Sequence, residues 1–484
     1  MKKRFIIFSI ATALSVFISI YLVQRDFIKN ESFSRSWEFY QNSNPKEYDF
    51  LIVGSSHLTM ALSPLQLWNE YGITSYNMAN FGQTMNESYW ILKDALNRVK
   101  PQLVVLDAYG LFGEDEFVSV NSENFHSNVD AMPLSITKIE MINDIVNEDE
   151  KLYYYFPLSY VHGVWGINSY QKSIDTQHSF KGEGLDTRDV EQNVPIFDLS
   201  KIKENDLVSQ NNSPSVAREY FCKSIELCKE NGVDVLLLNT PSRYDDEKQA
   251  WTNSVNSIAE KYEVDFLEMN KLGYLFNWTT DFRDEGHVNS SGARKVTSYL
   301  GQYVLENFKI KIEHNDIQMG KWNREYEEYR EYRLEQIKNQ TDLDSFWALL
   351  YNCSYDFVIE ITDQDVVRNE YYRSFLENLG VEENDFNISE NIVLFVNGKT
   401  KDITVIRDFS SDEVYQTVLG EAKKEQIIEG GYKIILKNET IVEVSATQTL
   451  NHVVRFAIFD ADRILYRGAF EKEESEVKKY NVYS

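Results

Sequence analysis

Three short stretches of the sequence carry the residue types that nucleophilic catalysis needs. The first is Gly54-Ser55-Ser56-His57, the second is centred on Gly82, and the third is Asp284-Glu285-Gly286-His287. A serine hydroxyl becomes a useful nucleophile only when a base removes its proton, and an imidazole held by a carboxylate does this near neutral pH. Each stretch alone is a weak signal, because Gly-Ser-Ser can form an ordinary turn and Asp-x-x-His is a common surface pair.

Taken together, the three stretches predict a serine nucleophile with its catalytic partners. Ser56 would be the nucleophile, His287 the general base and Asp284 the carboxylate that orients the imidazole. The oxyanion that develops during acyl transfer needs preorganised donors, and the backbone N–H groups of Ser56 and Gly82 are the expected pair. One such donor is worth about 3–4 kcal/mol. Gly82 could equally supply only a turn conformation that other residues avoid.

The elements between these stretches predict how they come together. Continuous apolar runs typical of strands buried on both faces alternate with amphipathic helical segments, which indicates an α/β fold with a parallel sheet. Open α/β sheets bind ligands at the carboxyl ends of their strands, where all three stretches are expected. The expected strands are 48–53, 75–79, 103–107, 233–238 and 264–267, and the expected helices are 64–71, 85–99, 216–231, 246–262 and 290–308.

The order and spacing of the three stretches resemble those of the SGNH/GDSL hydrolase superfamily. Its first block is similar to Gly54-Ser55-Ser56, its second to Gly82, and its last to Asp284 through His287 followed by Val288-Asn289 and Gly292. The resemblance covers about residues 48–308 and implies a flavodoxin-like three-layer domain. Within the superfamily the chain is most similar to membrane-tethered surface proteins of the DltD and AlgX kind.

This resemblance implies a function at the cell surface. The expected activity is that of an extracellular serine acyl-ester hydrolase or O-acyltransferase that acts on a cell-surface polysaccharide or cell-wall polymer through an acyl-Ser56 intermediate. The expected partners are that acylated glycan and a membrane-bound O-acyltransferase, and no cofactor is implied.

One departure from the superfamily pattern leaves an alternative open. The third block of the superfamily supplies an asparagine to the oxyanion hole, whereas the corresponding strand here ends Leu106-Asp107-Ala108-Tyr109. Either Asn80 supplies the missing donor or the hole has two donors. The departure favours the competing interpretation, a non-catalytic glycan-binding or assembly protein on an SGNH scaffold.

Three further side chains are candidates for substrate contact. His57 lies beside the nucleophile, and His162 and Trp165 lie in an aromatic segment of residues 113–205, which we expect to be a cap inserted over the site. Aromatic faces stack on sugar rings, so His162 and Trp165 could line a glycan cleft. The alternative for all three is that they pack the cap against the sheet.

The N-terminus predicts a membrane anchor. Residues 1–25 contain three basic residues followed by an uncharged apolar run, Phe5 to Val23, which is long enough to span a bilayer. Basic residues before the run predict a cytoplasmic N-terminus and a body on the extracellular side. A cleaved signal peptide is the alternative, but the residues after the run lack the small side chains that cleavage needs.

The rest of the chain predicts a second domain. Residues 26–47 are expected to be a connector, 48–310 the SGNH-like domain and 341–484 an α+β accessory domain. Residues 311–340 are expected to be a linker helix, because Lys321 to Gln340 shows no apolar stripe. Phe346 to Val381 weakly resembles the interleukin-like EMT inducer (PANDER-like) domain family, which implies glycan or partner contact.

Composition excludes several classes of function. The net charge of −27 is spread along the chain and argues against nucleic-acid binding, which requires a positive surface. Cys222, Cys228 and Cys353 form neither a disulfide framework nor a cluster with metal-ligand spacing, so we expect core thiols and no structural metal.

Overall fold

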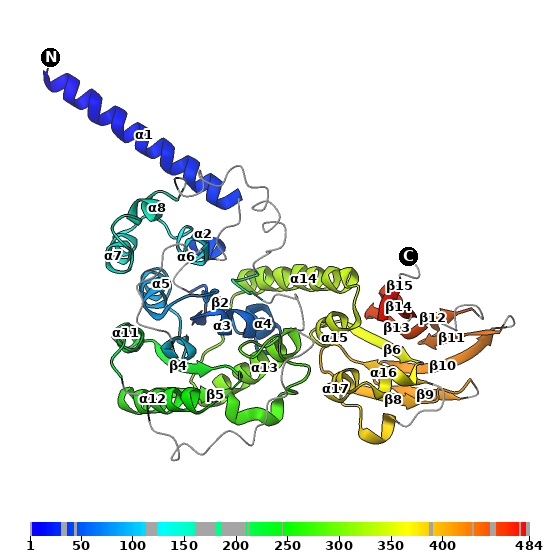
Figure 1. Ribbon diagram of the computed structural model, residues 1–484. Helices are drawn as coiled ribbons and strands as arrows, with labels where there is room; N and C mark the ends of the chain where they lie inside the picture. Colours follow the sequence, from blue (N-terminus) through cyan, green and yellow to red (C-terminus); the bar gives the residue numbers. More distant parts are fainter. Residues whose placement is uncertain are drawn as a thin grey trace. The chain divides into compact units, whose positions relative to one another are not determined.

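A computed structural model describes residues 2–30, 36–42, 46–112, 123–157, 159, 180–184, 210, 213–243, 245–386, 391–411, 413–427, 430–445, 452–473 and 476–480 (Figure 1). The chain divides into two compact units. The first comprises Met1–Leu185, Asp198–Gly273 and Val296–Trp322. The second comprises Asp186–Phe197, Tyr274–Lys295 and Asn323–Ser484.

The first unit is built on a five-stranded, all-parallel sheet, which confirms the predicted α/β fold. Its strand order is β2-β1-β3-β4-β5. The central strands are buried along their whole length because they are covered on both faces, as their continuous apolar sequences predict. The strands are β1 (Phe50–Val53), β2 (Ser75–Asn77), β3 (Leu103–Asp107), β4 (Asp234–Asn239) and β5 (Asp265–Glu268).

Helices connect these strands, and local sequence signals fix their ends. Ser63 accepts a hydrogen bond from the backbone of Gln66 at the start of α4 (Pro64–Tyr71), and Gly72 ends this helix with a φ of 70°. Asp245 caps α12 (Asp246–Tyr262) in the same way. Both helices have their predicted bounds. The other helices of this α/β pattern are α3 (Ser56–Ala61), α5 (Met85–Arg98), α11 (Val216–Glu230) and α13 (Ser290–Asn307).

The described part of the expected cap includes helices. It contains α6 (Glu123–Val129), α7 (Ile136–Ile145) and α8 (Lys151–Tyr155), drawn in cyan in Figure 1. The buried His126 ring stacks on Tyr154 with centroids 4.3 Å apart and bonds Asp130 through Nδ1 at 3.0 Å. Lys138 is also buried, where it donates to the carbonyls of Val129 and Met132, and burial lowers its pKa to about 8. His162 and Trp165 lie outside the described residues.

The predicted apolar segment at the N-terminus is helical. Helix α1 (Lys2–Asn30) contains a 21-residue stretch, Lys3–Val23, with a mean hydropathy of 2.4 and no part of it buried. By length and composition this stretch can cross a membrane. Whether it does, and which side the body occupies, stay predictions.

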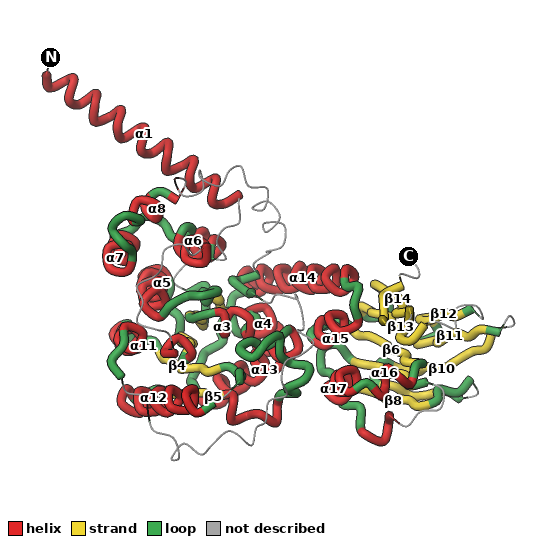
Figure 2. Tube along the Cα trace, in the orientation of Figure 1, coloured by secondary structure: helices red, strands yellow, loops and turns green. Residues whose placement is uncertain are grey.

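The second unit contains two antiparallel sheets, coloured yellow in Figure 2. One has six strands in the order β15-β14-β13-β6-β7-β8, and the other has four in the order β12-β11-β10-β9. The strands are β6 (Asp356–Ile361), β7 (Ile392–Val396), β8 (Ile403–Arg407), β9 (Val414–Thr417), β10 (Gly420–Ile427), β11 (Gly431–Leu436), β12 (Glu439–Val444), β13 (His452–Asp460), β14 (Arg463–Glu473) and β15 (Glu476–Tyr480).

The six-stranded sheet has an apolar core on each face. On one face Val358, Val393 and Phe395 join residues of the four-stranded sheet in a single cluster. On the other face Phe357, Ile359 and Leu394 pack with helices of the same unit. These helices include α15 (Leu343–Tyr351), α16 (Gln364–Arg368) and α17 (Glu370–Asn378).

The expected linker helix forms, but the expectation that Lys321 to Gln340 has no apolar stripe is wrong. Helix α14 (Asp316–Asn339) forms, but it buries Trp322, Tyr329, Arg333 and Ile337. These residues recur every four or seven positions and so share one face. The stripe was not recognised because aromatic and arginine side chains make up most of it.

The cysteines largely follow the prediction of core thiols. Cys228 and Cys353 are buried, whereas Cys222 is partly exposed, and none of the three forms a disulfide. Burial raises the pKa of Cys228 to about 12, so its thiol stays protonated and unreactive at neutral pH.

Candidate functional site

Ser56 lies on the turn between β1 and α3. Ser55 is the N-cap of α3 and accepts a hydrogen bond from the backbone of His57 at 3.4 Å, which makes Ser56 the first residue of the helix. Residues 50–55 and 57–61 are all buried, whereas Ser56 is partly exposed. The turn therefore presents Ser56 at the carboxyl end of β1.

Asp107, at the end of the neighbouring strand β3, holds this turn through hydrogen bonds. Its Oδ2 accepts hydrogen bonds from the backbone N–H of Ser55 at 2.8 Å and from the Ser55 hydroxyl, and its Oδ1 accepts from the N–H of Tyr109 at 2.9 Å. The approach requires glycine at position 54, since a Cβ there would lie 2.1 Å from the Cβ of Asp107. No role was predicted for Asp107, although a carboxylate at the end of an apolar strand is a signal for such a contact.

The second predicted stretch follows β2. The Asn80 backbone N–H donates to the carbonyl of Gly54 at 3.1 Å, which ties this loop to the Ser56 turn. Gly82 adopts a φ of 61°, in the left-handed region that favours glycine, and it is exposed. The Asn80 side chain points to α6 instead, where its Nδ2 donates to Ser127 at 2.9 Å. This bond takes one of the two N–H groups of the amide, so the expected oxyanion role of Asn80 stays a prediction.

His57 packs against the end of β3. Its ring is buried and stacks on Tyr109, with centroids 3.4 Å apart and planes inclined by 29°. Tyr109 precedes the expected cap, so both roles expected for His57, substrate contact and packing of the cap, stay predictions.

Asp284 and His287 form the predicted pair. The His287 Nδ1 lies 2.9 Å from Oδ1 and 3.0 Å from Oδ2 of Asp284. The backbone N–H groups of Gly286 and His287 donate to the same carboxylate at 2.8 and 2.9 Å. With Nδ1 held by a carboxylate, Nε2 is the ring nitrogen that would exchange a proton with a substrate or nucleophile in catalysis.

The electrostatics of this pair favour an ionised carboxylate. Partial burial raises the pKa of Asp284, but the hydrogen bond and charge of His287, together with the backbone donors, outweigh it and lower the pKa to about 2. Asp284 is therefore charged at neutral pH, the state in which it can orient an imidazole and stabilise the imidazolium.

A short hairpin carries the pair. Phe282 and Val288 form an antiparallel bridge, and the Arg283 N–H donates to the carbonyl of His287 at 2.9 Å. At the end of the hairpin, Asn289 accepts from the backbone of Ser291 at 2.9 Å and of Gly292 at 3.2 Å, which caps α13.

The predicted residues thus fall into two groups. Ser56, Asn80 and Gly82 belong to the first unit, and Asp284 and His287 to the second. Within each group the structure shows the contacts described above. That the groups act in one reaction stays a prediction.

Comparison with known proteins adds no relative: no family model matches the chain, and no curated protein matches it. Among the described residues, no group of three or more His, Cys, Asp and Glu side chains is arranged to hold a metal ion.

Proposed function

We propose that the protein is a membrane-anchored serine acyl esterase or O-acyltransferase of the SGNH type. Ser56 is the nucleophile, His287 the general base and Asp284 the orienting carboxylate. The observation that carries the proposal is the exposure of Ser56 on a turn otherwise buried from residue 50 to residue 61. A partly exposed hydroxyl at the end of a central strand, on a turn that Asp107 holds, supports the role of nucleophile.

The topology of the first unit supports this proposal. The order β2-β1-β3-β4-β5 is that of flavodoxin-like doubly wound sheets, in which ligands bind outside the carboxyl ends of the strands near the point where the order reverses. Here the order reverses between β1 and β3. Ser56 follows β1, and Asp107 ends β3.

In the proposed reaction Ser56 Oγ attacks the acyl carbonyl carbon while His287 Nε2 takes the hydroxyl proton. Collapse of the tetrahedral intermediate breaks the acyl–oxygen bond, and His287 returns the proton to the departing alcohol. Water or a sugar hydroxyl then attacks the acyl-Ser56 ester in the same way. Asp284 stays ionised throughout and stabilises the imidazolium.

The backbone N–H groups of Ser56 and Gly82 are the proposed oxyanion donors. Each is worth about 3 kcal/mol in the transition state when it is preorganised. Ser127 takes one of the two N–H groups of Asn80 Nδ2, and Asn80 as a third donor stays a prediction.

The proposed substrate is an acylated cell-surface polysaccharide or cell-wall polymer. The apolar stretch Lys3–Val23 anchors the chain, and Lys2, Lys3 and Arg4 keep its N-terminus in the cytoplasm, so that the body faces the polymer. A membrane-bound O-acyltransferase is the proposed donor partner; this part rests on the family resemblance alone.

Labelling with a fluorophosphonate, followed by peptide mass spectrometry, tests the proposal on the full chain in detergent. We expect one adduct on Ser56, its loss in Ser56→Ala, and labelling at least about 100-fold slower in His287→Ala, because unassisted serine is a poor nucleophile. Ser159→Ala, which removes an exposed serine of the same unit, should label like the parent.

A folded chain without an adduct on Ser56 would overturn the enzyme assignment and favour a non-catalytic glycan-binding protein on the same scaffold. If the adduct forms, the acylation state of the surface polymer in cells that carry Ser56→Ala identifies the direction of transfer. Excess acyl groups indicate a hydrolase, and a deficit indicates a transferase.

A further inference from the structure

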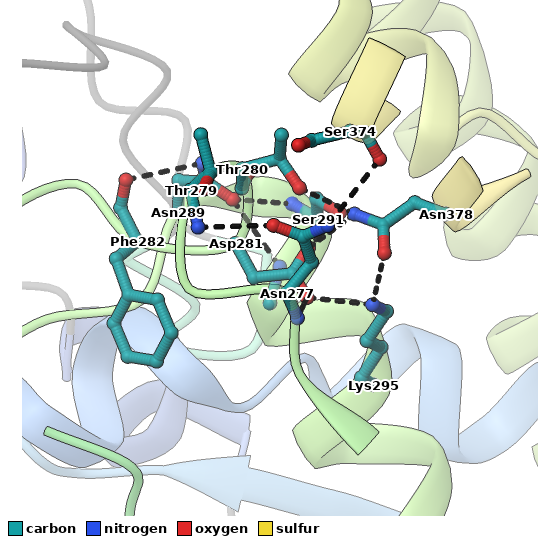
Figure 3. Close-up of polar contacts among 11 residues, drawn as sticks. Asn277, Thr279, Thr280, Asp281, Phe282, Asn289, Ser291, Lys295, Ser374 and Asn378 are labelled. Atoms are coloured by element: carbon teal, nitrogen blue, oxygen red, sulfur yellow. Dashed lines mark hydrogen bonds and ion pairs between the residues drawn. The ribbon is translucent and has the colours of Figure 1, made fainter. Parts of the chain in front are cut away.

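Asp281 is a fully buried carboxylate (Figure 3). It directly precedes the hairpin that carries Asp284 and His287. Its oxygens accept hydrogen bonds from the Asn277 backbone at 2.8 Å, Ser291 Oγ at 2.5 Å, Lys295 Nζ at 2.6 Å and Asn378 Nδ2 at 3.1 Å. A buried charge is tolerated only with such compensation. Asp281 is therefore the centre of a specific polar cluster.

This cluster closes the base of the hairpin that carries Asp284 and His287. The Asn289 N–H donates to the carbonyl of Asp281 at 3.0 Å, and Asn289 Nδ2 donates to the carbonyl of Thr280 at 2.7 Å. Gly292 leaves room for this closure, since a Cβ there would lie 2.2 Å from the Asp281 carbonyl oxygen. The two ends of the hairpin are thus held together at Asp281.

Helix α17 supplies the other side of the cluster. Asn378 Nδ2 also donates to Thr280 Oγ1, and Asn378 Oδ1 accepts from Lys295 Nζ at 2.9 Å. The carbonyl of Ser374, one turn earlier in α17, accepts from Asn277 Nδ2 at 3.5 Å. In Figure 3 these side chains converge from the hairpin segment, α13 and α17.

Helix α17 is itself fixed in the core of the second unit. Phe375 and Leu376 are buried in the cluster that also contains Phe357 and Ile359 of β6. A polar chain of contacts therefore runs from this core through Asn378 and Asp281 to the hairpin.

We propose that Asn378 and Asp281 are positioning residues for His287. Through them the core of the second unit fixes the geometry of the Asp284–His287 pair. This inference rests on the proposed function of Ser56 and His287. Asn378 thereby acquires a role in the site although it lies 91 residues beyond His287 in the sequence.

The test compares Asn378→Ala with Glu377→Ala in the full chain. Glu377 is the preceding residue of α17, is exposed, and pairs with Arg373 on the helix surface. We expect Asn378→Ala to slow fluorophosphonate labelling of Ser56 about 10- to 100-fold, because displacement of a reacting group by about 1 Å has effects of this size. Glu377→Ala should label at the parent rate.

A double-mutant cycle separates positioning from a general loss of structure. In a His287→Ala background, Asn378→Ala should change the residual labelling rate less than twofold, since its effect acts through His287. Equal effects of Asn378→Ala in the two backgrounds would overturn the positioning role, as would an unchanged labelling rate in the single variant.

Hydrogen exchange of the peptide covering residues 277–289 gives a readout that does not depend on activity. We expect faster exchange in Asn378→Ala than in Glu377→Ala. If the parent chain is not labelled at Ser56, the proposed function fails, and exchange alone then decides whether Asn378 braces the hairpin. Unchanged exchange would overturn that brace.

Discussion

The Ser56 turn and the His287 hairpin place their side chains by different physical means. The Ser56 turn follows a fully buried apolar strand, and Asp107 of the neighbouring strand fixes it. The His287 hairpin is bounded by a single β-bridge and held at its base by the polar cluster around Asp281. Close packing at Gly54 and the hydrogen bonds of one carboxylate, Asp107, therefore fix the Ser56 turn. The His287 hairpin depends instead on a cluster of hydrogen bonds and an ion pair around Asp281.

This difference predicts different sensitivities. A packed turn fails when atoms are added, because the interior has no free volume. A polar cluster fails when one partner is removed, because the others remain buried without it.

Gly54→Ala should have the largest effect. The added methyl group would lie 2.1 Å from the Cβ of Asp107, so strand or turn must move. We expect a loss of about 3 kcal/mol or more, measured by urea denaturation, together with loss of Ser56 labelling. Gly320→Ala is the control, since nothing lies within 4 Å of its added methyl group. This helical substitution should be neutral or stabilise by up to about 1 kcal/mol. A comparable loss in both variants would contradict the packing argument.

Asp281→Asn should follow, with a loss of about 3 kcal/mol. The change leaves the charge of Lys295, whose side chain is 16% exposed, without its carboxylate. Asp462→Asn is the matched control, because the Asp462–Lys437 pair of the same unit is 74% and 48% exposed and should contribute less than about 0.5 kcal/mol. Equal losses in calorimetry would show that burial of the Asp281 pair has no energetic consequence.

Asp107→Asn should have a smaller effect on stability, about 2 kcal/mol. Asparagine keeps the shape, but it replaces a charged acceptor of two Ser55 hydrogen bonds by a neutral one. The turn should then hold Ser56 less rigidly, so we also expect slower fluorophosphonate labelling of Ser56. The dependence of the labelling rate on pH should stay unchanged. A changed profile would indicate that Asp107 acts on the base instead of the turn.

The difference between local signals and long-range contacts explains which parts of the structure could be predicted from the sequence. The parallel strands were recognised because apolar runs such as Phe50–Val53 are local signals of burial on both faces. Ser56 and the Asp284–His287 pair were recognised because each is defined within a few residues. The contacts of Asp281 with Asn378 join residues 97 positions apart, and no local pattern indicates such a pairing.

Strands of the second unit show the same limit. Strand β10 reads Gly-Glu-Ala-Lys-Lys-Glu-Gln-Ile, a composition poor in β-forming residues, and it was not predicted. It forms because it pairs with β9 on one side and β11 on the other, and because Ala422 is buried in the core between the sheets. Tertiary pairing overrode local preference there.

The pH dependence of the hairpin should be the smallest of these effects. Because the pKa of Asp284 lies at about 2 in the folded chain, below its ordinary value of 3.8, the ionised carboxylate stabilises the fold above about pH 4. That contribution is lost as the pH falls toward 2.

The side chain of Asp284 is 33% exposed, so solvent screening should keep this contribution to stability below about 1 kcal/mol. We expect the difference in unfolding free energy between the parent and Asp284→Asn to shrink as the pH falls from about 4 toward 2. A difference that stays constant down to about pH 3 would mean that His287 and the backbone donors do not stabilise the charged form.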